Sequence, residues 1–426
     1  MKITCLALAF LFAATTASSG EKVYTLEEAC QSALGSNETV KIAEEDVAQS
    51  DFRIDQAWTY VYPRLVAKSA YTRFNETLPT GGGAFLFQPE EQFQAGLVLT
   101  QPLYTGGRTL AAIRMARKLQ ESSRSGLSST KQDTLLKVAE AYYGVLKAQQ
   151  SIELNRRSLE RMERHKTITE REASTRKTKV NKSALLRAST LVSQAKINLI
   201  RAQDGTKVAK EKLVLLSRLP LDALVTEPRP LEQPTESLPI LTETALNSRD
   251  DFANSKTNQN IASENVTIVR GAHYPQLYAE AGLTYQDSRP RMLTDATGYY
   301  GGVRLQIPLF EGGLMKAEVS EARSKARQAE LSTEFLRKSI VTEVHEAYVN
   351  LQTLSSVLDT AKLQLEYAQG NSEAVEGLFS EGLVSSLSVI DAEQVLNMAE
   401  NELLHATYDR QVAILKLKKS IGQLGK

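Results

Sequence analysis

Few side chains in this 426-residue sequence have a spacing that could support catalysis. The chain has four histidines, which are His165, His273, His345 and His405. They are scattered, their spacing indicates no metal site, and surface or packing roles are expected. The glycines at 81–83 lack the following Lys-Ser/Thr of a phosphate-binding loop, and no nucleophile elbow occurs. The sequence therefore predicts a protein that is not an enzyme and that has no cofactor and no metal.

Basic side chains crowd one short stretch in the first half of the chain. They are Arg171, Arg176, Lys177, Lys179 and Lys182. Like charges so close together repel one another and stay in contact with water. The simplest interpretation is a solvated turn, and the functional hypothesis is a surface that binds an acidic partner.

The overall charge excludes one large class of partner. Lys and Arg number 51 against 50 Asp and Glu, so the formal net charge is +1. Such a balanced chain does not predict nucleic-acid binding. With 42% hydrophobic and 24% charged residues, the composition is that of a folded chain.

The first residues have the pattern of a secretory signal peptide, which we place at residues 1–19. Lys2 precedes an apolar run from Ile3 to about Ala14, and small residues follow at 17–20, where cleavage is expected. The run is about twelve residues, shorter than the roughly 20 that a spanning helix needs. Only Cys30 remains after cleavage, so an internal disulfide is not expected. We interpret Cys30 as a packed helix residue.

The same order of signals occurs twice, roughly 210 residues apart. The recurring pairs are Tyr62-Pro63 with Tyr274-Pro275, Pro102-Leu103-Tyr104 with Pro308-Leu309-Phe310, Gly106-Gly107 with Gly312-Gly313, and Glu140-Ala141-Tyr142 with Glu346-Ala347-Tyr348. Five prolines lie between the copies and block helix and sheet continuation. We therefore divide the chain into repeat 1 at 20–219, a Pro-rich linker at 220–239 and repeat 2 at 240–426.

Each repeat is expected to contain one β-hairpin, at about 63–102 and about 275–308. In the segment 276–286, apolar residues from Leu277 to Tyr285 alternate with more polar ones, the period of a sheet with one apolar face. Each strand has about ten to twelve residues, enough to cross a bilayer when tilted. A soluble hairpin with one wet face would have the same local pattern.

The remaining sequence predicts unusually long helices. From Val344, aliphatic residues recur every seven positions to Leu365, interleaved with small residues, which is the seam of a coiled coil. The last helix repeats the pattern around Leu396 and Ala399. A first long helix from after Gly107 to about Ser174 would have about 67 residues and a length on the order of 100 Å.

Two hairpins supply four strands per chain, which is too few for a membrane barrel. The smallest known barrels have about eight strands, and open sheet edges are not tolerated in lipid. No later stretch is apolar enough for a membrane helix, so any spanning role falls to the strands. Several chains must then share one barrel, and strand periodicity alone does not choose between two, three or four.

These features together resemble the TolC family of outer-membrane efflux and secretion ducts. The resemblance rests on the duplicated Tyr-Pro and Pro-Leu-aromatic-x-Gly-Gly motifs and on the segment FSEGLVSSLSVIDAE at 379–393, and it covers essentially the whole mature chain. It implies an α+β membrane protein: a homotrimer whose twelve-stranded β-barrel in the outer membrane continues as an α-helical coiled-coil barrel across the periplasm. It also implies docking to an inner-membrane pump through a periplasmic adaptor.

The resemblance also identifies candidate residues at the periplasmic aperture. The family's turn glycine matches Gly382, and the second of two inward carboxylates matches Asp391, whose threefold ring would attract cations. The first carboxylate position is Ser388, the latch tyrosine position is Phe379 and the latch arginine position is Val384. An ordinary solvated helix residue is the alternative for Asp391. The basic stretch at 171–182 is the equivalent turn of the first repeat, and three such tips would face the adaptor.

The predicted function is a passive exit duct of a tripartite efflux pump or a type I secretion system. It would lie in the cell outer membrane, in contact with its lipid, and extend into the periplasm. The alternative is a secreted coiled-coil scaffold or periplasmic adaptor without a membrane pore. The sequence leaves the cargo open, whether drug, metal or protein.

Overall fold

The computed structural model describes residues 23–75, 89–175, 179–289 and 296–425. The signal peptide expected at 1–19 lies outside these residues. The chain divides into two compact units, each built from three stretches. The helical unit comprises residues 1–37, 137–232 and 354–412, and the sheet unit comprises 38–136, 233–353 and 413–426. Both units draw on both halves of the chain, and the division into two sequence repeats stays a prediction.

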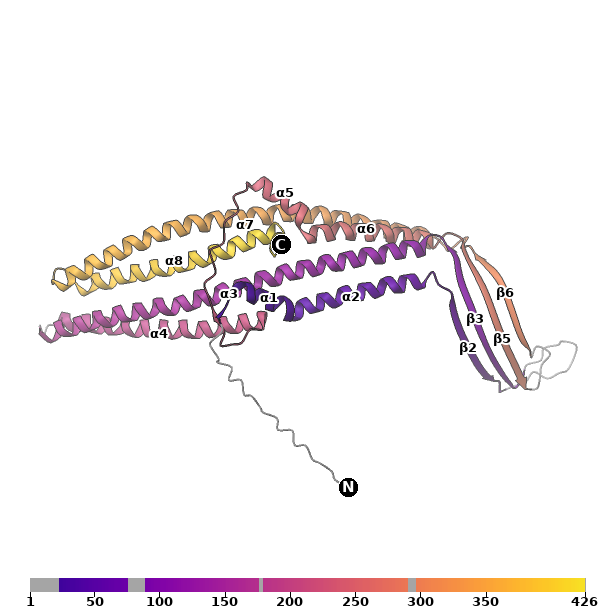
Figure 1. Cartoon of the computed structure of the whole chain (residues 1–426), viewed down its shortest axis with the longest axis horizontal. Coiled ribbons are helices and arrows are strands. Elements are labelled where there is room, and N and C mark those ends of the chain that lie inside the picture. Colours follow the sequence, from indigo (N-terminus) through magenta and orange to yellow (C-terminus); the bar gives the residue numbers. More distant parts are fainter. Residues whose placement is uncertain (1–22, 76–88, 176–178, 290–295, 426) are drawn as a thin grey trace, which may run out of the picture. The chain divides into compact units, whose positions relative to one another are not determined.

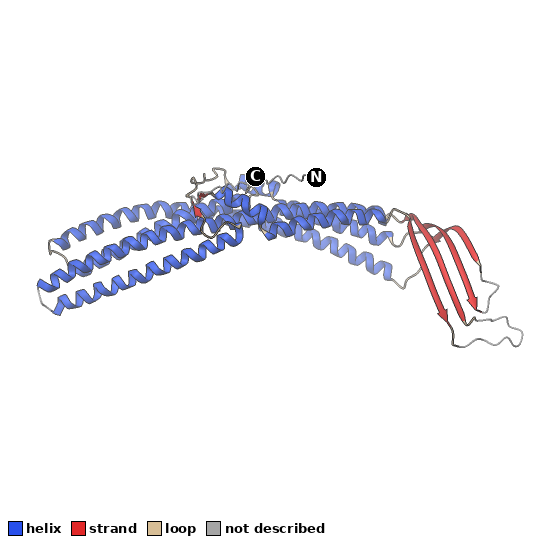
Figure 2. Cartoon of the chain, turned by 60° about the horizontal axis from the view of Figure 1, so that its bottom comes forward, coloured by secondary structure: helices blue, strands red, loops and turns tan. Residues whose placement is uncertain are grey.

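The sheet unit contains the four strands that the alternating patterns predict (Figure 2). They are β2 (Arg64–Arg73), β3 (Glu91–Thr105), β5 (Gln276–Arg289) and β6 (Thr297–Gln306), and they form one antiparallel sheet in the order β2-β3-β5-β6. The register of β3 against β5 joins the two hairpins, with Leu97 between Ala67 and Leu283. The ladder shifts between Pro102 and Tyr104, where a proline cannot donate its hydrogen bond.

The two faces of this sheet differ in chemistry. Side chains alternate between the faces along each strand, and directly paired residues lie on the same face, so the strand register assigns each residue to one face. The apolar face carries Leu65, Phe93, Leu97, Leu99, Leu277, Leu283, Tyr285, Val303 and Leu305. The polar face carries Arg64, Lys68, Gln94, Gly96, Thr100, Glu280, Gly282, Thr284 and Arg304. In the single chain the apolar face is open, and Val303 and Leu305 are 67% and 59% exposed. An apolar face that extends over all four strands is expected to be covered by lipid or by another protein surface.

Two hairpins of long helices account for about half of the chain (Figure 1). The first is α3 (Arg108–Thr175) with α4 (Lys179–Ser217), and the second is α7 (Leu314–Ser380) with α8 (Ser386–Ser420). The 68 residues of α3 confirm the long helix predicted after Gly107. Gly106 and Gly107 precede it with φ angles of 64° and 83°, and a Cβ on Gly106 would lie 2.2 Å from the Gly271 carbonyl oxygen. Only glycine fits this close approach between chain segments.

The period-seven residues form the helix contacts that the sequence predicts. In the helical unit, Ala368 of α7 packs with Leu396 and Ala399 of α8, and Leu365 lies against them. In the first hairpin, Met162 of α3 packs with Val192 and Ala195 of α4. Small residues at these positions let the helix backbones approach closely.

Short elements complete the chain. They are β1 (Val23–Tyr24), α1 (Leu26–Ser36), α2 (Glu38–Thr59), β4 (Leu224–Val225), α5 (Leu238–Ser248) and α6 (Asp250–Gly271). Thr25 and Glu28 form a capping box at the start of α1. Cys30 lies within α1, where burial, followed by the nearby charge of Glu27, raises the pKa of its thiol to about 11. No described helix is long and apolar enough to cross a membrane.

The Pro-rich linker is anchored rather than free. Its strand β4 pairs in parallel with β1, and the Tyr142 hydroxyl lies 2.8 Å from the Tyr24 carbonyl oxygen and 2.6 Å from that of Thr226. The Leu231 amide donates to the side chain of Gln411, 2.9 Å away. The linker therefore packs onto α3 and α8 inside the helical unit.

Candidate functional site

The turn between α7 and α8 is built around Gly382. Its φ of 76° is unfavourable for residues with a side chain. The Gly382 amide donates to the Phe379 carbonyl at 2.9 Å, and the Leu383 amide donates to the Leu378 carbonyl at 2.9 Å. These two bonds are a Schellman motif, which ends α7 and satisfies its last carbonyls. Gly382 therefore lies in the turn between α7 and α8, and its place at a periplasmic aperture stays a prediction.

The two helical hairpins meet close to this turn through a histidine of α3. His165 is buried, its Nε2 lies 2.8 Å from the hydroxyl of Ser386 at the start of α8, and its ring lies 5.2 Å from the ring of Phe379. Burial lowers the pKa of His165, and the nearby carboxylate of Glu376 opposes this shift only in part. The neutral imidazole is therefore favoured at this junction.

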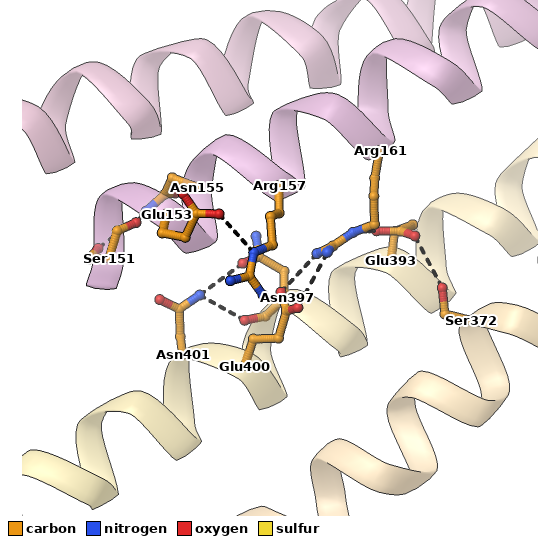
Figure 3. A network of polar contacts seen from close by, with 10 residues as sticks. All are labelled: Ser151, Glu153, Asn155, Arg157, Arg161, Ser372, Glu393, Asn397, Glu400 and Asn401. Carbon is orange, nitrogen blue, oxygen red and sulfur yellow. Dashed lines mark hydrogen bonds and ion pairs between the residues drawn. The ribbon is translucent and has the colours of Figure 1, made fainter. Parts of the chain in front are cut away.

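One turn before His165, Arg161 forms a buried ion cluster with two carboxylates of α8. Its Nε lies 2.7 Å from Glu393 and its Nη2 lies 2.8 Å from Glu400. The other carboxylate oxygen of Glu393 accepts a hydrogen bond from Ser372 of α7 at 3.1 Å. Figure 3 shows these side chains converging from three helices. We call the group Arg161, Ser372, Glu393 and Glu400 the clasp.

The clasp is shielded from water, so the stability of its charges depends on their ion pairs. The side chains of Arg161, Glu393 and Glu400 are 16%, 7% and 10% exposed. Burial disfavours the charge on Arg161, but hydrogen bonds and charges from Glu400 and Glu393 outweigh it and raise the pKa of the guanidinium. A charge held this far from water is stable only while its partners are present.

Polar contacts on either side of the clasp stay mostly within one helix. In α3, Arg157 donates to Glu153 at 3.1 Å, and in α8 the Asn401 side chain donates to the Asn397 carbonyl at 2.7 Å (Figure 3). Because Arg157 and Glu153 are largely exposed, this pair contributes little to stability. The clasp is therefore the part of the network that joins the hairpins.

The residues assigned to the aperture by resemblance take different places. Phe379 is buried against His165, and Val384 is half-buried in the turn. Ser388 lies in the first turn of α8, its amide donating to the Ser385 carbonyl at 3.0 Å. Asp391 is exposed, and its neighbours Ile390 and Ala392 are buried, so its carboxylate is directed away from the helix seam. The structure does not bring Asp391 into the clasp.

The basic stretch lies at the turn of the other hairpin, between the end of α3 and the start of α4. Arg171 and Lys182 are both exposed. Arg176 and Lys177 fall outside the described residues, as does the side chain of Lys179, the first residue of α4. Two of the five predicted residues are therefore placed on an exposed surface.

The sequence interpretation missed His165, Arg161 and their partners as a site. The spacing of residues in α3 contained a signal for His165. It lies seven residues after Ser158, and both are buried, which is the spacing of a helix seam. Met162 and Thr169 are a second buried pair seven residues apart. Nothing in the sequence links Arg161 to Glu393, which are 232 positions apart. Among the described residues, no three His, Cys, Asp or Glu side chains are grouped as a metal site. The arrangement can join helices.

Comparisons with known proteins agree with this architecture. The profile of a family described as outer membrane efflux protein matches residues 29–217 and 241–423. The outer membrane protein TolC of Vibrio cholerae serotype O1 is 25% identical over 343 residues, which cover 78% of this chain and 76% of that protein. The alkaline protease secretion protein AprF of Pseudomonas aeruginosa is 25% identical over 355 residues, covering 78% and 70%.

Solved structures extend the likeness to the fold. The Campylobacter jejuni CmeC outer membrane channel superposes with a TM-score of 0.81 at 16% identity, over 93% of this chain and 85% of that chain. Identity at this level carries the fold alone.

Proposed function

Because this chain belongs to the outer membrane efflux protein family, we propose that it is the passive exit duct of a tripartite efflux pump or a type I secretion system. It is an outer-membrane protein that extends into the periplasm. The main observation that supports a membrane-embedded duct is the sheet with one open apolar face. Lipid is the cover that this face requires, since a strand face of alternating apolar residues is stable against hydrocarbon.

The sheet edges support assembly from several chains. Among the described residues, β2 pairs only with β3 and β6 pairs only with β5, so each chain has two open edges. Open edges leave backbone groups unsatisfied in lipid, and four strands cannot close on themselves. Three chains joined edge to edge would supply twelve strands, the number that the family resemblance implies. In this assembly the long helices would continue the barrel into the periplasm.

A closed entrance would have a physical basis in the clasp and His165. The latch positions of the family are Phe379 and Val384 here, so a tyrosine–arginine latch cannot form. Arg161 and His165 instead hold the α3/α4 hairpin against α7/α8 in the helical unit. We assign to these contacts the role of keeping the entrance closed. Asp391, exposed near this turn, would form the threefold carboxylate ring that attracts cations.

The partners follow from the same assembly. A periplasmic adaptor would contact the basic turn at 171–182 and connect the duct to an inner-membrane pump. The relative AprF is named for secretion of an alkaline protease, so export of a protein is one cargo class for this chain and small molecules are the other. Reversing the charge of Arg176, Lys177 and Lys179 should weaken adaptor binding while the trimer stays intact, and unchanged binding at low salt would exclude this surface.

One set of measurements tests the duct. The protein should require detergent for extraction from the outer membrane, have the mass of three chains, and conduct ions in a planar bilayer. A soluble monomer without conductance would overturn the proposal and favour a periplasmic scaffold. Membrane extraction with the mass of two or four chains would keep the duct and reject the trimer.

A further inference from the structure

The polar face of the sheet carries more positive than negative charge. Its charged side chains in the described strands are Arg64 and Lys68 on β2, Glu280 on β5 and Arg304 on β6. Three cations against one carboxylate leave an excess of two positive charges per chain. The charges at the far ends of the strands, such as Arg73 and Glu91, belong to the apolar face.

The single carboxylate is already neutralised by its neighbour. Arg304 donates to Glu280 across the β5–β6 pair, and its guanidinium carbon lies 5.7 Å from the centre of the Tyr278 ring. Pairing with a carboxylate and stacking near an aromatic face satisfy this arginine locally. The excess charge of the face therefore belongs to Arg64 and Lys68.

Arg64 and Lys68 have no ion partner among the described residues. They lie four residues apart on β2, so they point to the same face. Arg64 is opposite Thr100 and Lys68 is opposite Gly96 on β3, neither of which offers a charge. The residues next across the sheet from Lys68 are Thr284 and Gly298, so its surroundings are small and neutral.

We propose that Arg64 and Lys68 form a basic ring inside the exit that attracts multivalent anions and sets the charge preference of this end of the duct. The inference rests on the proposed trimeric barrel, in which the apolar face meets lipid and the polar face meets the lumen. Two unpaired cations from each of three chains place six positive charges on the wall. The exit would then differ in sign from the Asp391 ring at the entrance.

The expected ligand follows from the electrostatics of a wide, water-filled pore. Exposed charges are screened over about 10 Å at 0.1 M salt, so single anions in the middle of the lumen are weakly affected. A compact polyanion can contact several basic side chains at once, and its attraction is strengthened by their number. Block by a polyanion is therefore a more sensitive readout than ion selectivity.

The test measures block of the channel current by inositol hexakisphosphate, a compact polyanion, added to each side of a planar bilayer in turn. In about 50 mM KCl, the intact protein should be blocked at lower concentration from the barrel side. The variant with Arg64→Gln and Lys68→Gln should need at least about tenfold more polyanion for the same block. Raising the salt to about 0.5 M should remove the difference between them.

The matched control is Arg73→Gln, which removes a cation from the same strand but from the apolar face. It should be blocked as the intact protein is. The basic ring would be overturned if the double variant were blocked as strongly as the intact protein, or if Arg73→Gln weakened the block as much as the double variant does. Either result would leave the proposed duct standing. Absence of any conductance from the intact protein would instead overturn the duct and the ring together. Recovery of the double variant with the mass of the intact assembly shows that its altered block is not a folding defect.

Discussion

Replacing Arg161 with methionine should loosen the two helical hairpins more than any nearby charge removal. Methionine keeps much of the aliphatic volume of arginine but leaves the carboxylates of Glu393 and Glu400 without their cation. Both carboxylates are at most 10% exposed, so water cannot replace the lost partner without rearrangement. Ser372 would remain as the neutral donor to Glu393.

The expected cost follows from this burial. Removing one partner of a buried ion pair destabilises a protein by roughly 3–5 kcal/mol, because an uncompensated charge stays buried. A difference of about 3 kcal/mol changes an equilibrium by roughly a hundredfold. If the clasp keeps the entrance closed, the open population of the variant should rise by about that factor in each chain.

Two measurements on the detergent-solubilised full chain test this prediction. The thermal midpoint of the helical circular dichroism should fall, and the bilayer conductance should rise. Arg157→Met is the matched control: Arg157 pairs only with exposed Glu153 among the described side chains, and its loss should cost about 0.5 kcal/mol or less. Adding Glu393→Gln and Glu400→Gln to the Arg161 variant should recover stability, because no buried charge remains unpaired.

Two outcomes would contradict a role of the clasp in closure. An Arg161 variant with the conductance and thermal midpoint of the control would show that the clasp contributes nothing to closure or stability. A lower midpoint with unchanged conductance would keep the clasp as a structural contact and remove its role at the entrance.

Four further predictions concern single positions. Gly382→Ala should lower the thermal midpoint by the equivalent of about 1 kcal/mol because φ is positive there, whereas Gly370→Ala inside α7 should raise it, since alanine is the better helix former. The pKa of His165 is lowered in the folded chain, so the stability that neutral His165 contributes is present above its unfolded pKa and is lost as the pH falls. Acidification from about pH 7.5 to about pH 5.5 should therefore lower the thermal midpoint more in the intact protein than in His165→Gln. Tyr142→Phe removes the hydroxyl that lies within hydrogen-bond distance of the Tyr24 carbonyl and of the Thr226 carbonyl and amide. Limited proteolysis should then cut the linker at 220–239 faster, and an unchanged rate would count against the anchoring role. Asp391→Asn should reduce block of the current by a trivalent cation added from the helical side, and equal block would return Asp391 to an ordinary solvated residue.

The long helices and the strands were predictable because their signals are local. Aliphatic and small residues at a period of seven predicted the seams that the helix contacts follow, including Leu396 and Ala399. Alternation over 276–286 predicted which side of β5 is apolar. The paired glycines before α3 and α7 marked the turns, since a positive φ is a property of a few residues and appears directly in the residue type.

The partner of each buried polar group was not predictable from the sequence. Arg161 occurs among other basic residues of α3, and its carboxylates occur among other acidic residues of α8. Sequence shows that a charge exists, whereas burial decides whether that charge needs a partner. The family resemblance identified Phe379 and Val384 as latch positions, but it did not identify His165, whose ring packs on Phe379 and whose Nε2 lies beside the Ser386 hydroxyl.

Local sequence patterns were enough to predict the first long helix, the alternation of the strands and the membership of a family of export proteins. Those properties depend on periodicity and on residues near one another in the chain. The tertiary structure was needed to show that Arg161 meets Glu393 and that Arg64 and Lys68 have no ion partner among the described residues. Such pairings depend on helix packing and strand register over long separations, and the free energy of a charge is set by the neighbours and the water that remain around it.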